Sequence, residues 1–599
     1  MPTEFIGVYL PVSEVFPDTE SNFETFISLL KRLSLTDALF WCARLNLVIS
    51  KSEVDHKVKQ EFCLKQLLSQ DEIRKVNDFT RKHGGASKVT IFFRGQLLEL
   101  IRWLVLFSKN LPGDGTTFEG PKMRQDFVKA ALIVSDIWAQ RVFSDRFSMK
   151  GGKTVARNRA LGPIRKSVEA TLRVSMLPQF LGRGWLLFTE YFPRHYHFFE
   201  KEFRLTTHIA LEEYYVCVAA IIINFMSPKI GSGLFNTHEL IHLESYGQIF
   251  EKYLSLECQT ADELKNAFWS SYNNTPDSFD DTMYNYLPLR ERPIFHKKED
   301  GRAIILDPLF YSEKASIGPL FLLPRNSREK AFAAFGKAFE DYVGDILKRM
   351  FPDLSSAKNK RISCNILGKD EDGSDIEIDA CLNDLNELVL FEIKFGLIRE
   401  DKVLSSDYES FTDHLKDKYV KSIKGDKGIG QLARVIKILA SQKWLGNDFE
   451  FARAEKIYPI LVLYDPLLNA QVYGHFFANE FENLLEPDKK LQNGILVKGS
   501  LHVIPPIIVT IDDLENLETS IEHFGFRDLL RDYSNSHPDR LESLHNFLVS
   551  SHYKNHMFHN KNLAKAGLDI IEKSAQAIFR KLPSITPEQN SNSTFKQGS

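Results

Sequence analysis

A short strand-like segment, residues 387–396, constrains the fold of this chain more than any other stretch. It reads Glu-Leu-Val-Leu-Phe-Glu-Ile-Lys-Phe-Gly, and its β-branched and aromatic residues, closed by a glycine, are typical of a buried strand. Successive side chains on a strand point to opposite faces, so Glu392 and Lys394 share one face while Phe391 and Ile393 pack on the other. The pattern therefore predicts a carboxylate and an ammonium side by side on an otherwise apolar strand.

A second segment, residues 375–382, alternates in the same way and ends next to a turn. Its sequence is Asp-Ile-Glu-Ile-Asp-Ala-Cys-Leu, and the following Asn-Asp-Leu-Asn supplies turn-forming residues. Two alternating runs joined by such a turn predict a β-hairpin. In that hairpin Asp379 can lie beside Glu392.

Two neighbouring carboxylates and an amine suggest a specific chemistry. Carboxylates held together repel each other unless a cation sits between them, and hard oxygen ligands suit Mg²⁺ or Mn²⁺. Such a metal lowers the pKa of its bound water and polarises a phosphoryl oxygen, as phosphodiester hydrolysis requires. The adjacent Lys394 could stabilise phosphate charge or orient a water. The alternative is a strand end with a structural Glu–Lys pair, because this spacing also arises by chance.

Helices are predicted on both sides of the hairpin. Residues 328–351 carry apolar side chains at helical spacing, with Ser327 as an N-cap and Glu340 at the edge of the apolar stripe. Residues 430–439 begin a second amphipathic helix, which carries Gln431. Two further strands are predicted at 458–464 and 502–510.

Together these residues resemble the PD-(D/E)xK, or restriction-endonuclease-like, nuclease superfamily. That superfamily combines a helix carrying a Glu, a hairpin carrying an Asp and a Glu-x-Lys, and a following helix that often carries a Gln. The matching residues in this chain are Glu340, Asp379, Glu392, Lys394 and Gln431. The resemblance covers roughly residues 325–520, and it implies a mixed central sheet flanked by helices.

The resemblance also implies hydrolysis that depends on a divalent metal, Mg²⁺ or Mn²⁺. The metal ligands that it implies are Asp379, Glu392, the backbone carbonyl of Ile393, and Glu340 either directly or through water. Lys394 would assist the nucleophilic water, and Gln431 would support the site or the substrate backbone. The Pro-Asp of the family's name is absent, because Glu377 and Ile378 precede the aspartate, and this removes one specific marker.

Basic residues that follow the hairpin are candidates for contact with a nucleic-acid backbone. They are Lys416, Lys418, Lys421, Lys424, Lys427 and Arg434. Such cations position a phosphate chain without reading bases, and binding through them falls steeply with salt. The alternative is a solvated helix face. Because the formal net charge is only −3, any nucleic-acid binding must come from local patches.

The length of 599 residues and the change of pattern along the chain predict an α+β protein of several domains. The predicted parts are a mainly helical region at 1–285 for partner or substrate contact, a small β-containing connector at 286–324, the nuclease-like domain at 325–520, a helical extension at 521–585 and a disordered tail at 586–599. Within the connector, extended runs are expected at 293–295, 302–306 and 319–323.

Cysteine usage and the amino terminus predict a cytoplasmic protein. Six scattered cysteines form no CxxC pair, which argues against a disulfide framework or a structural zinc site. The first residues lack a basic stretch followed by an apolar one, so no secretion signal is expected. The most apolar run, 216–226, is far shorter than the roughly 20 residues that cross a bilayer, and it indicates a core helix without membrane contact.

Two other patterns offer competing chemistry. His238-Glu-Leu-Ile-His242 matches the HExxH motif of zinc peptidases, for which Glu257 or Glu263 could supply a third ligand. We favour a helix with two partly exposed histidines. The basic run at 150–159 could contact phosphates, although an ordinary solvated loop is favoured and the glycine spacing of an ATP-binding loop is missing.

The expected function is hydrolysis of nucleic-acid phosphodiester bonds, with DNA favoured over RNA on the superfamily's general habit. A nuclease domain fused to a large partner-like region also resembles restriction or host-defence architectures, by analogy. The alternatives are a nuclease-fold protein that binds or scaffolds without cutting, and the zinc metallopeptidase. Association into a homo-oligomer, or with a protein partner through the amino-terminal half, stays open.

Overall fold

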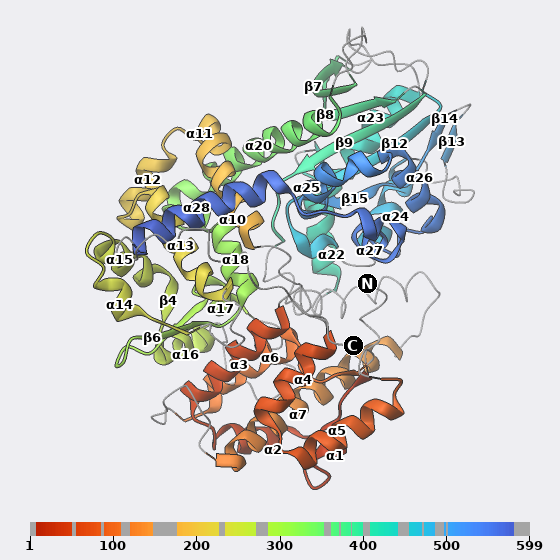
Figure 1. The fold of residues 1–599 in the computed structure, drawn as a ribbon. Helices are drawn as coiled ribbons and strands as arrows, with labels where there is room; N and C mark the ends of the chain where they lie inside the picture. Colours follow the sequence, from red (N-terminus) through yellow and green to blue (C-terminus); the bar gives the residue numbers. More distant parts are fainter. Residues whose placement is uncertain are drawn as a thin grey trace, which may run out of the picture.

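The protein is a mixed α+β chain in which helices predominate before the central sheet (Figure 1). The computed structural model describes residues 8–50, 56–85, 89–109, 120–147, 177–226, 234–270, 286–352, 361–369, 373–384, 386–398, 408–423, 425–440, 454–469, 473–485, 496–498 and 501–579. The predicted basic run at 150–159, the candidate Lys424 and the predicted disordered tail lie outside these residues.

Helices form the amino-terminal unit. They are α1 (Val12–Val15), α2 (Phe23–Leu30), α3 (Leu35–Ser50), α4 (His56–Leu67), α5 (Gln70–Lys82), α6 (Arg94–Phe107) and α7 (Gly120–Phe147), with a parallel pair of two-residue strands, β1 (Val8–Tyr9) and β2 (Val89–Thr90). Helix α6 is buried along most of its length, and its polar residues Arg94, Gln96, Glu99 and Arg102 are buried together with its apolar ones. Its Trp103 is fully buried at the centre of this unit.

The middle of the chain adds more helices and a small sheet. The helices are α10 (Leu177–Leu186), the π-helical η2 (Leu187–Tyr191), α11 (Phe192–His195), α12 (Phe199–Thr207), α13 (Leu211–Met226), α14 (Thr237–Ile241), α15 (Gly247–Glu257), α16 (Ala261–Ser270), α17 (Leu287–Glu291), α18 (Pro308–Ser316) and α19 (Gly318–Phe321). Helix α13 contains the apolar run at 216–226 and lies in the core, as predicted. Within the described residues no single helix has the length and apolar composition to span a membrane, while one bent pair, 199–207 with 211–223, meets both criteria when taken together.

The strands of the predicted connector pair with strands outside it. The four-stranded sheet has the order β3-β6-β5-β4, where β3 is Leu234–Asn236, β4 is Cys258–Gln259, β5 is Ile294–His296 and β6 is Arg302–Ile305. The connector therefore shares its sheet with the preceding helical region. The extended run predicted at 319–323 is wrong, because residues 318–321 form α19, whose second position is Pro319, where a helix tolerates proline best.

A larger mixed sheet follows the long helix α20 (Arg325–Met350). Its strands are β7 (Ile362–Lys369), β8 (Asp375–Asp384), β9 (Glu387–Lys394), β12 (Lys456–Leu463), β13 (Leu496–Lys498), β14 (Leu501–Val503) and β15 (Ile507–Thr510). The order is β13-β14-β12-β9-β8-β7, and β15 also pairs with β12. Strands β7, β8 and β9 are antiparallel neighbours, whereas β9, β12, β14 and β15 run parallel. The predicted strand at 502–510 is interrupted between β14 and β15 by two prolines, which cannot donate to the sheet.

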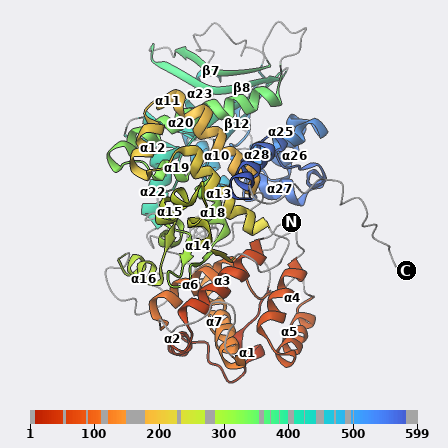
Figure 2. The same ribbon diagram turned by 60° about the vertical axis from the view of Figure 1, so that its left-hand side comes forward.

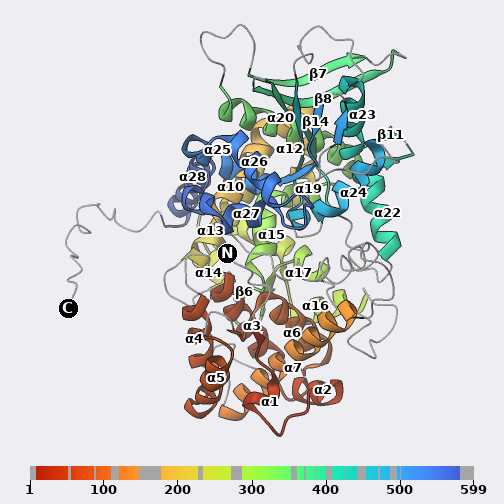
Figure 3. The same ribbon diagram turned by 90° about the vertical axis from the view of Figure 1, so that its right-hand side faces the viewer.

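Helices cover both faces of this sheet. On one face, α20, α25 (Ile511–Ser520) and α26 (Phe526–Ser536) contribute to an apolar cluster that we call the α20-side core, which includes Phe391 and Ile393. On the other face, α22 (Tyr408–Tyr419), α23 (Ile429–Ala440) and α24 (Tyr473–Leu485) form the α23-side core with Leu388 and Leu390. Figure 3 shows the two groups of helices on opposite sides. Strand β9 thus lies at the centre of a three-layer arrangement.

Helix α20 follows the predicted apolar stripe but begins earlier than expected. It starts at Arg325 after the N-cap Pro324, so the predicted N-cap at Ser327 is wrong. Arg328 donates to the carbonyls of Phe321 and Leu323, which ties this first turn to the preceding helix.

The last helices return to the middle of the chain. After α27 (Leu544–Ser550) and the 3₁₀ turn η6 (His552–His556), α28 (Lys561–Phe579) packs along α10 and α13, as Figure 2 shows. Two glycines permit this close approach. A Cβ on Gly182 would lie 2.1 Å from the carbonyl oxygen of Leu563, and a Cβ on Gly567 would lie 1.9 Å from that of Pro178. The predicted helical extension is therefore helical, and it is packed against the first half of the chain.

Buried polar contacts reinforce these long-range connections. Arg183 of α10 reaches α25, where its Nη2 lies 2.6 Å from Glu515 Oε2, and both side chains are buried. The hydroxyl of Tyr342 on α20 donates to the same carboxylate at 2.7 Å. In the amino-terminal unit, Arg94 makes a buried pair with Asp307, the N-cap of α18, at 2.8 Å. Each buried pair ties together segments that are distant in sequence.

The glycine contact between α10 and α28 gives a stability prediction. Gly182→Ala should destabilise the protein by about 1–3 kcal/mol or more, because the new methyl group meets a backbone carbonyl that cannot move without shifting a helix. Gly336→Ala is the matched control, since it lies within helix α20 and its Cβ would meet no atom within 4 Å. That control should gain about 0.5–1 kcal/mol from helix propensity. Thermal unfolding of both variants measures the difference, and equal effects would contradict the packing.

Candidate functional site

The predicted hairpin is confirmed as strands β8 and β9. They are antiparallel, and Ala380 pairs with Phe391, so the same register places Asp379 opposite Glu392. Asp379 Oδ2 accepts a hydrogen bond of 2.6 Å from the backbone N–H of Ile393. This bond fixes the orientation of the aspartate toward the neighbouring strand.

Two carboxylates and one ammonium meet on this hairpin. Asp379 is 7 % exposed and Glu392 is 2 % exposed, so both acids are buried. Lys394 Nζ lies 2.6 Å from Glu392 Oε1 and 3.6 Å from Asp379 Oδ2, and the lysine is half-buried. The alternation along β9 directs these polar groups away from the α20-side core that Phe391 and Ile393 join, as the sequence predicted.

Burial and mutual repulsion set the protonation of these groups. Burial, followed by the charge of Asp379, raises the pKa of Glu392 to about 8, although Lys394 opposes the shift. Burial acts to lower the pKa of Lys394, but the charges of Glu392 and Asp379 outweigh it and raise that pKa above its ordinary value. The Lys394 ammonium therefore stays protonated. The carboxyl of Glu392 binds a proton more readily than an ordinary glutamate does.

Glu340 adds a third acid from helix α20. It is half-buried, and its pKa is raised to about 7 by burial and then by the charge of Asp379. Its field also contributes to the raised pKa of Glu392. The helix, the hairpin and the sheet thus bring the predicted Glu340, Asp379 and Glu392 into one electrostatic neighbourhood.

The chemistry of these donors suits a hard divalent cation. Carboxylate oxygens are among the ligands that Mg²⁺ and Mn²⁺ prefer, and Asp379 and Glu392 supply them beside the same lysine. Within the residues that the structure describes, no group of three or more His, Cys, Asp or Glu side chains is arranged to hold a metal ion. Lys394 is the cation that faces both carboxylates in this arrangement.

Gln431 caps its own helix. Its Oε1 accepts a hydrogen bond of 3.2 Å from the backbone N–H of Gly428, just before α23 begins. Helix α23 packs in the α23-side core, on the face of β9 that carries Leu388 and Leu390. This contact gives Gln431 a role in ordering the start of α23, and its predicted role at the site stays a prediction.

The basic candidates differ in whether their side chains contact other groups of the protein or are exposed to solvent. Lys416 pairs with Glu480 at 3.0 Å, and Lys418 donates to the carbonyl of Leu397. Lys421 is exposed in β10 (Lys421–Ser422), which forms a small hairpin with β11 (Gly425–Asp426). Lys427 and Arg434 are half-buried. Of the predicted phosphate contacts that the structure describes, Lys421 is therefore the most accessible.

Two contacts that the sequence did not signal join the basic region to the site strand. The hydroxyl of Tyr419 donates to the carbonyl of Gly396 at 2.9 Å, next to the bond from Lys418 to Leu397. Both acceptors follow Lys394 directly along the chain. The end of α22 therefore holds the segment that follows β9 in place. A Lys-Tyr pair at the end of a helix carries no recognisable sequence signal for such a role.

The HExxH residues lie on a helix too short for the motif. Helix α14 ends at Ile241, and His242 Nδ1 lies 2.6 Å from the backbone carbonyl of His238. Both histidines are exposed, as the favoured interpretation predicted. Glu257 is buried and pairs with Lys314 at 3.2 Å, and Glu263 caps helix α16 through the backbone N–H of Thr260. The carboxylates considered as a third ligand are engaged elsewhere.

Comparisons with known proteins add no relative. No family model matches the chain, no curated protein matches it, and no solved structure matches it.

The raised pKa of Glu392 predicts a pH-dependent stability in metal-free buffer. The folded protein holds this proton more tightly than the unfolded chain, for which the pKa is 4.5, so stability should fall as pH rises from about 5 through 8. Glu392→Gln removes this titration, so the free energy of unfolding should vary less with pH over this range. Relative to pH 5, the variant should lose less stability at pH 8 than the wild type does, by about 1 kcal/mol or more, since one pKa unit corresponds to about 1.4 kcal/mol.

The measurement is denaturant unfolding in a chelator at pH 5, 6, 7 and 8. Glu61→Gln is the control, because Glu61 is an exposed residue of the amino-terminal unit for which the profile should keep its wild-type shape. A Glu392→Gln profile parallel to that of the wild type would contradict the buried, proton-holding state of this carboxyl.

Proposed function

We propose that this protein is a metal-dependent nuclease that hydrolyses phosphodiester bonds of nucleic acid, with DNA favoured over RNA. The observation that supports it most is the convergence of Asp379, Glu392 and Lys394 on the β8–β9 hairpin, with Glu340 of α20 near enough for its charge to help raise the pKa of Glu392. The mixed sheet between two layers of helices also fits the restriction-endonuclease-like architecture proposed for residues 325–520. A restriction or host-defence setting is the proposed biological context, by analogy of architecture.

The metal ligands proposed are the Asp379 and Glu392 carboxylates and the Ile393 carbonyl, with Glu340 directly or through water. When bound, Mg²⁺ or Mn²⁺ would supply an acidified water and a polarised phosphoryl oxygen. The bond from the Ile393 N–H orients one oxygen of Asp379 and leaves the other to face a ligand. Glu392 and Glu340 must both be ionised to serve as ligands, which is costly without a cation because burial and repulsion raise each pKa.

Lys394 has two roles in this proposal. Its ammonium lies against both carboxylates and compensates their charge while no substrate or metal is present. Its proton stays on Nζ at neutral pH, so the same group can donate a hydrogen bond to a phosphate oxygen or hold a water in line with the phosphorus. Burial of β9 on both faces keeps bulk water away from the interior side of this cluster.

A second candidate function is nucleic-acid binding without cleavage by the same fold. The observation that favours it is that Lys394 already compensates both carboxylates, at 2.6 Å from Glu392 and 3.6 Å from Asp379. The zinc peptidase receives no such support, because the His242 ring and the two considered glutamates contact other groups.

A cleavage assay separates the two functions. With Mg²⁺ or Mn²⁺, the wild type should cut at least one substrate among linear and circular duplex DNA, single-stranded DNA and RNA. Lys394→Ala and Glu392→Gln should each lower the rate by about 10²–10⁴-fold, as loss of a group acting in proton transfer or charge stabilisation does.

The matched control is Lys561→Ala, which removes an exposed lysine at the start of α28, away from the hairpin, and should cut at the wild-type rate. Failure of the wild type on every substrate would reject the nuclease and leave the binding protein. Wild-type rates in Lys394→Ala would show that the catalytic residues are elsewhere.

The basic residues predict how binding depends on salt. In buffer that contains a chelator, the logarithm of the binding constant should fall with the logarithm of the salt concentration. The magnitude of this slope should be smaller by about one unit in Lys421→Ala, because one exposed cation in contact with a phosphate releases about one counterion. Lys416→Ala should change the slope less, since Glu480 already neutralises that ammonium. Fluorescence anisotropy with a labelled duplex measures both slopes, and identical slopes for Lys421→Ala and wild type would remove this lysine from the interface.

A further inference from the structure

One residue of β7 has a backbone conformation that regular strands do not contain. Asn365 lies in the middle of this strand with a φ of 53°, in the left-handed region. In the described part of the chain, the other non-glycine residues with positive φ are His208 and Arg540, and both lie outside strands. His208 is the C-cap of α12, where this conformation is common. Asn365 therefore needs a different explanation.

This residue stands in the same row as the candidate site. Strand β7 is the neighbour of β8 at one end of the large sheet (Figure 1). Cys364 pairs with Ala380 and Ile366 pairs with Ile378, so the register places Asn365 opposite Asp379. Asp379 in turn lies opposite a residue of β9, Glu392, by the register of the next pair of strands. The left-handed residue is thus one strand away from the carboxylate that bonds to β9.

The side-chain alternation of β7 inverts at Asn365. Ile362 belongs to the α20-side core and Cys364 packs against it, so the residues before Asn365 follow the two-residue period. Ile366, two residues after Cys364, belongs to the α23-side core on the opposite face. Because residues i and i+2 share a face in a regular strand, the left-handed residue marks the point where β7 changes faces.

Strand β8 inverts at the same level. Ile378 belongs to the α23-side core, whereas Ala380 belongs to the α20-side core, so the change of faces falls at Asp379. Directly opposite residues of paired strands lie on the same face, and this requires the two strands to invert together. Strand β9 keeps a regular alternation, since its residues 388 and 390 join one core and 389, 391 and 393 join the other.

The inversion explains how Asp379 reaches the backbone of β9. Strand N–H groups lie in the plane of the sheet, whereas a side chain on a regular strand stands roughly perpendicular to it. The ladder between β8 and β9 ends at Ala380 and Phe391. Beyond that point the carboxylate of Asp379 accepts the hydrogen bond of the Ile393 N–H, which a backbone carbonyl would accept in a regular ladder. The aspartate thereby lies between two strands, with its Oδ2 3.6 Å from Lys394 Nζ.

The chemistry of asparagine fits a role of its backbone. Asparagine adopts the left-handed conformation more readily than almost any residue except glycine. The Asn365 side chain is exposed, and it makes no hydrogen bond within the described part of the chain. Its contribution to the fold is therefore the conformation that it permits, because no contact of its amide holds β7 and β8 together.

We propose that Asn365 is a positioning residue of the candidate site: its left-handed backbone maintains the inversion of β7 and β8 and so holds the Asp379 carboxylate on the Ile393 N–H, beside Lys394. This inference deepens the proposed nuclease site. It rests on the proposed function only for its consequence in cleavage, since the position of Asp379 can be measured without any activity.

Hydrogen exchange of the Ile393 amide in the full-length protein tests the proposal, measured by mass spectrometry of peptides from β9. Asn365→Val should accelerate this exchange by about tenfold or more, because a β-branched residue disfavours the left-handed region and loss of one hydrogen bond is an effect of this size. Asn365→Gly should exchange at the wild-type rate, because glycine adopts positive φ readily. Asp379→Ala removes the acceptor and gives the rate for complete loss of the bond.

The matched control is His208→Val, which places the same residue at another left-handed position, at the end of α12. It should leave the exchange of the Ile393 amide unchanged. Asn365→Ala imposes a smaller steric penalty and should accelerate exchange less than Asn365→Val, which keeps the test available if the valine variant does not fold. Thermal unfolding establishes which variants are folded. Wild-type exchange in folded Asn365→Val and Asn365→Ala, or accelerated exchange in Asn365→Gly, would overturn the proposal.

The cleavage assay separates this inference from the proposed function. Asn365→Val should lose cleavage together with Asp379→Ala, by about 10²-fold or more, while Asn365→Gly should cut at close to the wild-type rate. A wild type that cuts nothing rejects the nuclease, and the exchange rates still decide the role of Asn365. Loss of cleavage in Asn365→Gly with wild-type exchange would overturn the positioning role, because the amide itself would then be the group that acts.

Discussion

The burial of two carboxylates beside one ammonium on the β8–β9 hairpin is the constraint on which the rest of this structure depends. Strand β9 lies between two apolar cores, so a charged side chain on it must be paired where it stands. Lys394 provides that pairing for Asp379 and Glu392. A slip of one residue in the β8–β9 register would turn Glu392 and Lys394 toward the α20-side core, which makes the observed register the one that can be tolerated.

Such a cluster is a poor source of stability. Replacing a buried ionic group by apolar residues often leaves stability unchanged or raises it, because the free-energy penalty of desolvating the charges is as large as their mutual attraction. The raised pKa values of Glu340 and Glu392 report the same imbalance, since each acid is inclined to take up a proton. Groups held at this cost on a central strand fit a site that acts on a ligand, which is the physical basis of the proposed nuclease.

The chain holds its parts together through contacts between segments distant in sequence. The α10–α28 contact depends on Gly182 and Gly567, and the pairs Arg183–Glu515 and Arg94–Asp307 bury charge between elements that are hundreds of residues apart. Truncating one partner of a buried pair typically costs about 3–5 kcal/mol, because the other charge is left without compensation. The amino-terminal half is therefore held in a defined position relative to the sheet.

The sequence by itself determined the local elements and the side chains that share a face. The two-residue alternation of 375–382 and 387–394 specified the hairpin and the side of β9 on which Glu392 and Lys394 stand, and the helical spacing of 328–351 specified α20 with Glu340 at its edge. These features follow from periodicity, which is a property of neighbouring residues.

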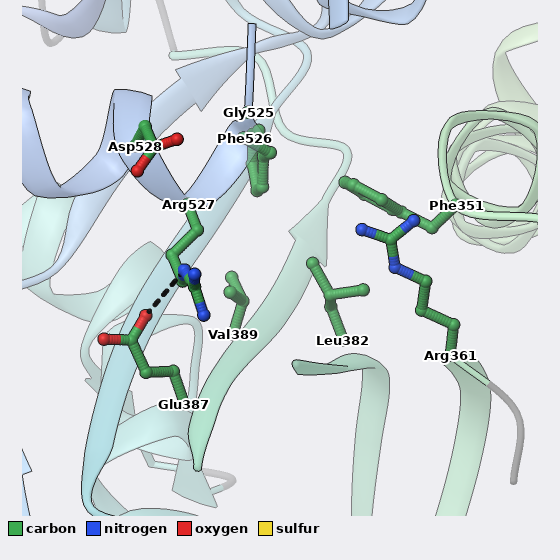
Figure 4. A pocket seen from close by; sticks show the side chains of 9 residues that line it. All are labelled: Phe351, Arg361, Leu382, Glu387, Val389, Gly525, Phe526, Arg527 and Asp528. Carbon is green, nitrogen blue, oxygen red and sulfur yellow. Dashed lines mark ion pairs between the residues drawn. The ribbon is translucent and has the colours of Figure 1, made fainter. Parts of the chain in front are cut away.

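Only the tertiary structure decided what those elements touch. The pairing of the connector strands with β3 and β4, the return of α28 to α10, and the engagement of Lys416 and Lys418 depend on residues far away in the chain. A pocket lined by both Arg361 and Arg527 (Figure 4) also depends on distant residues, since these two arginines stand 166 positions apart in the sequence. Periodicity in a sequence reports the faces of a helix or strand, and the partner that covers each face is chosen by packing over the whole chain.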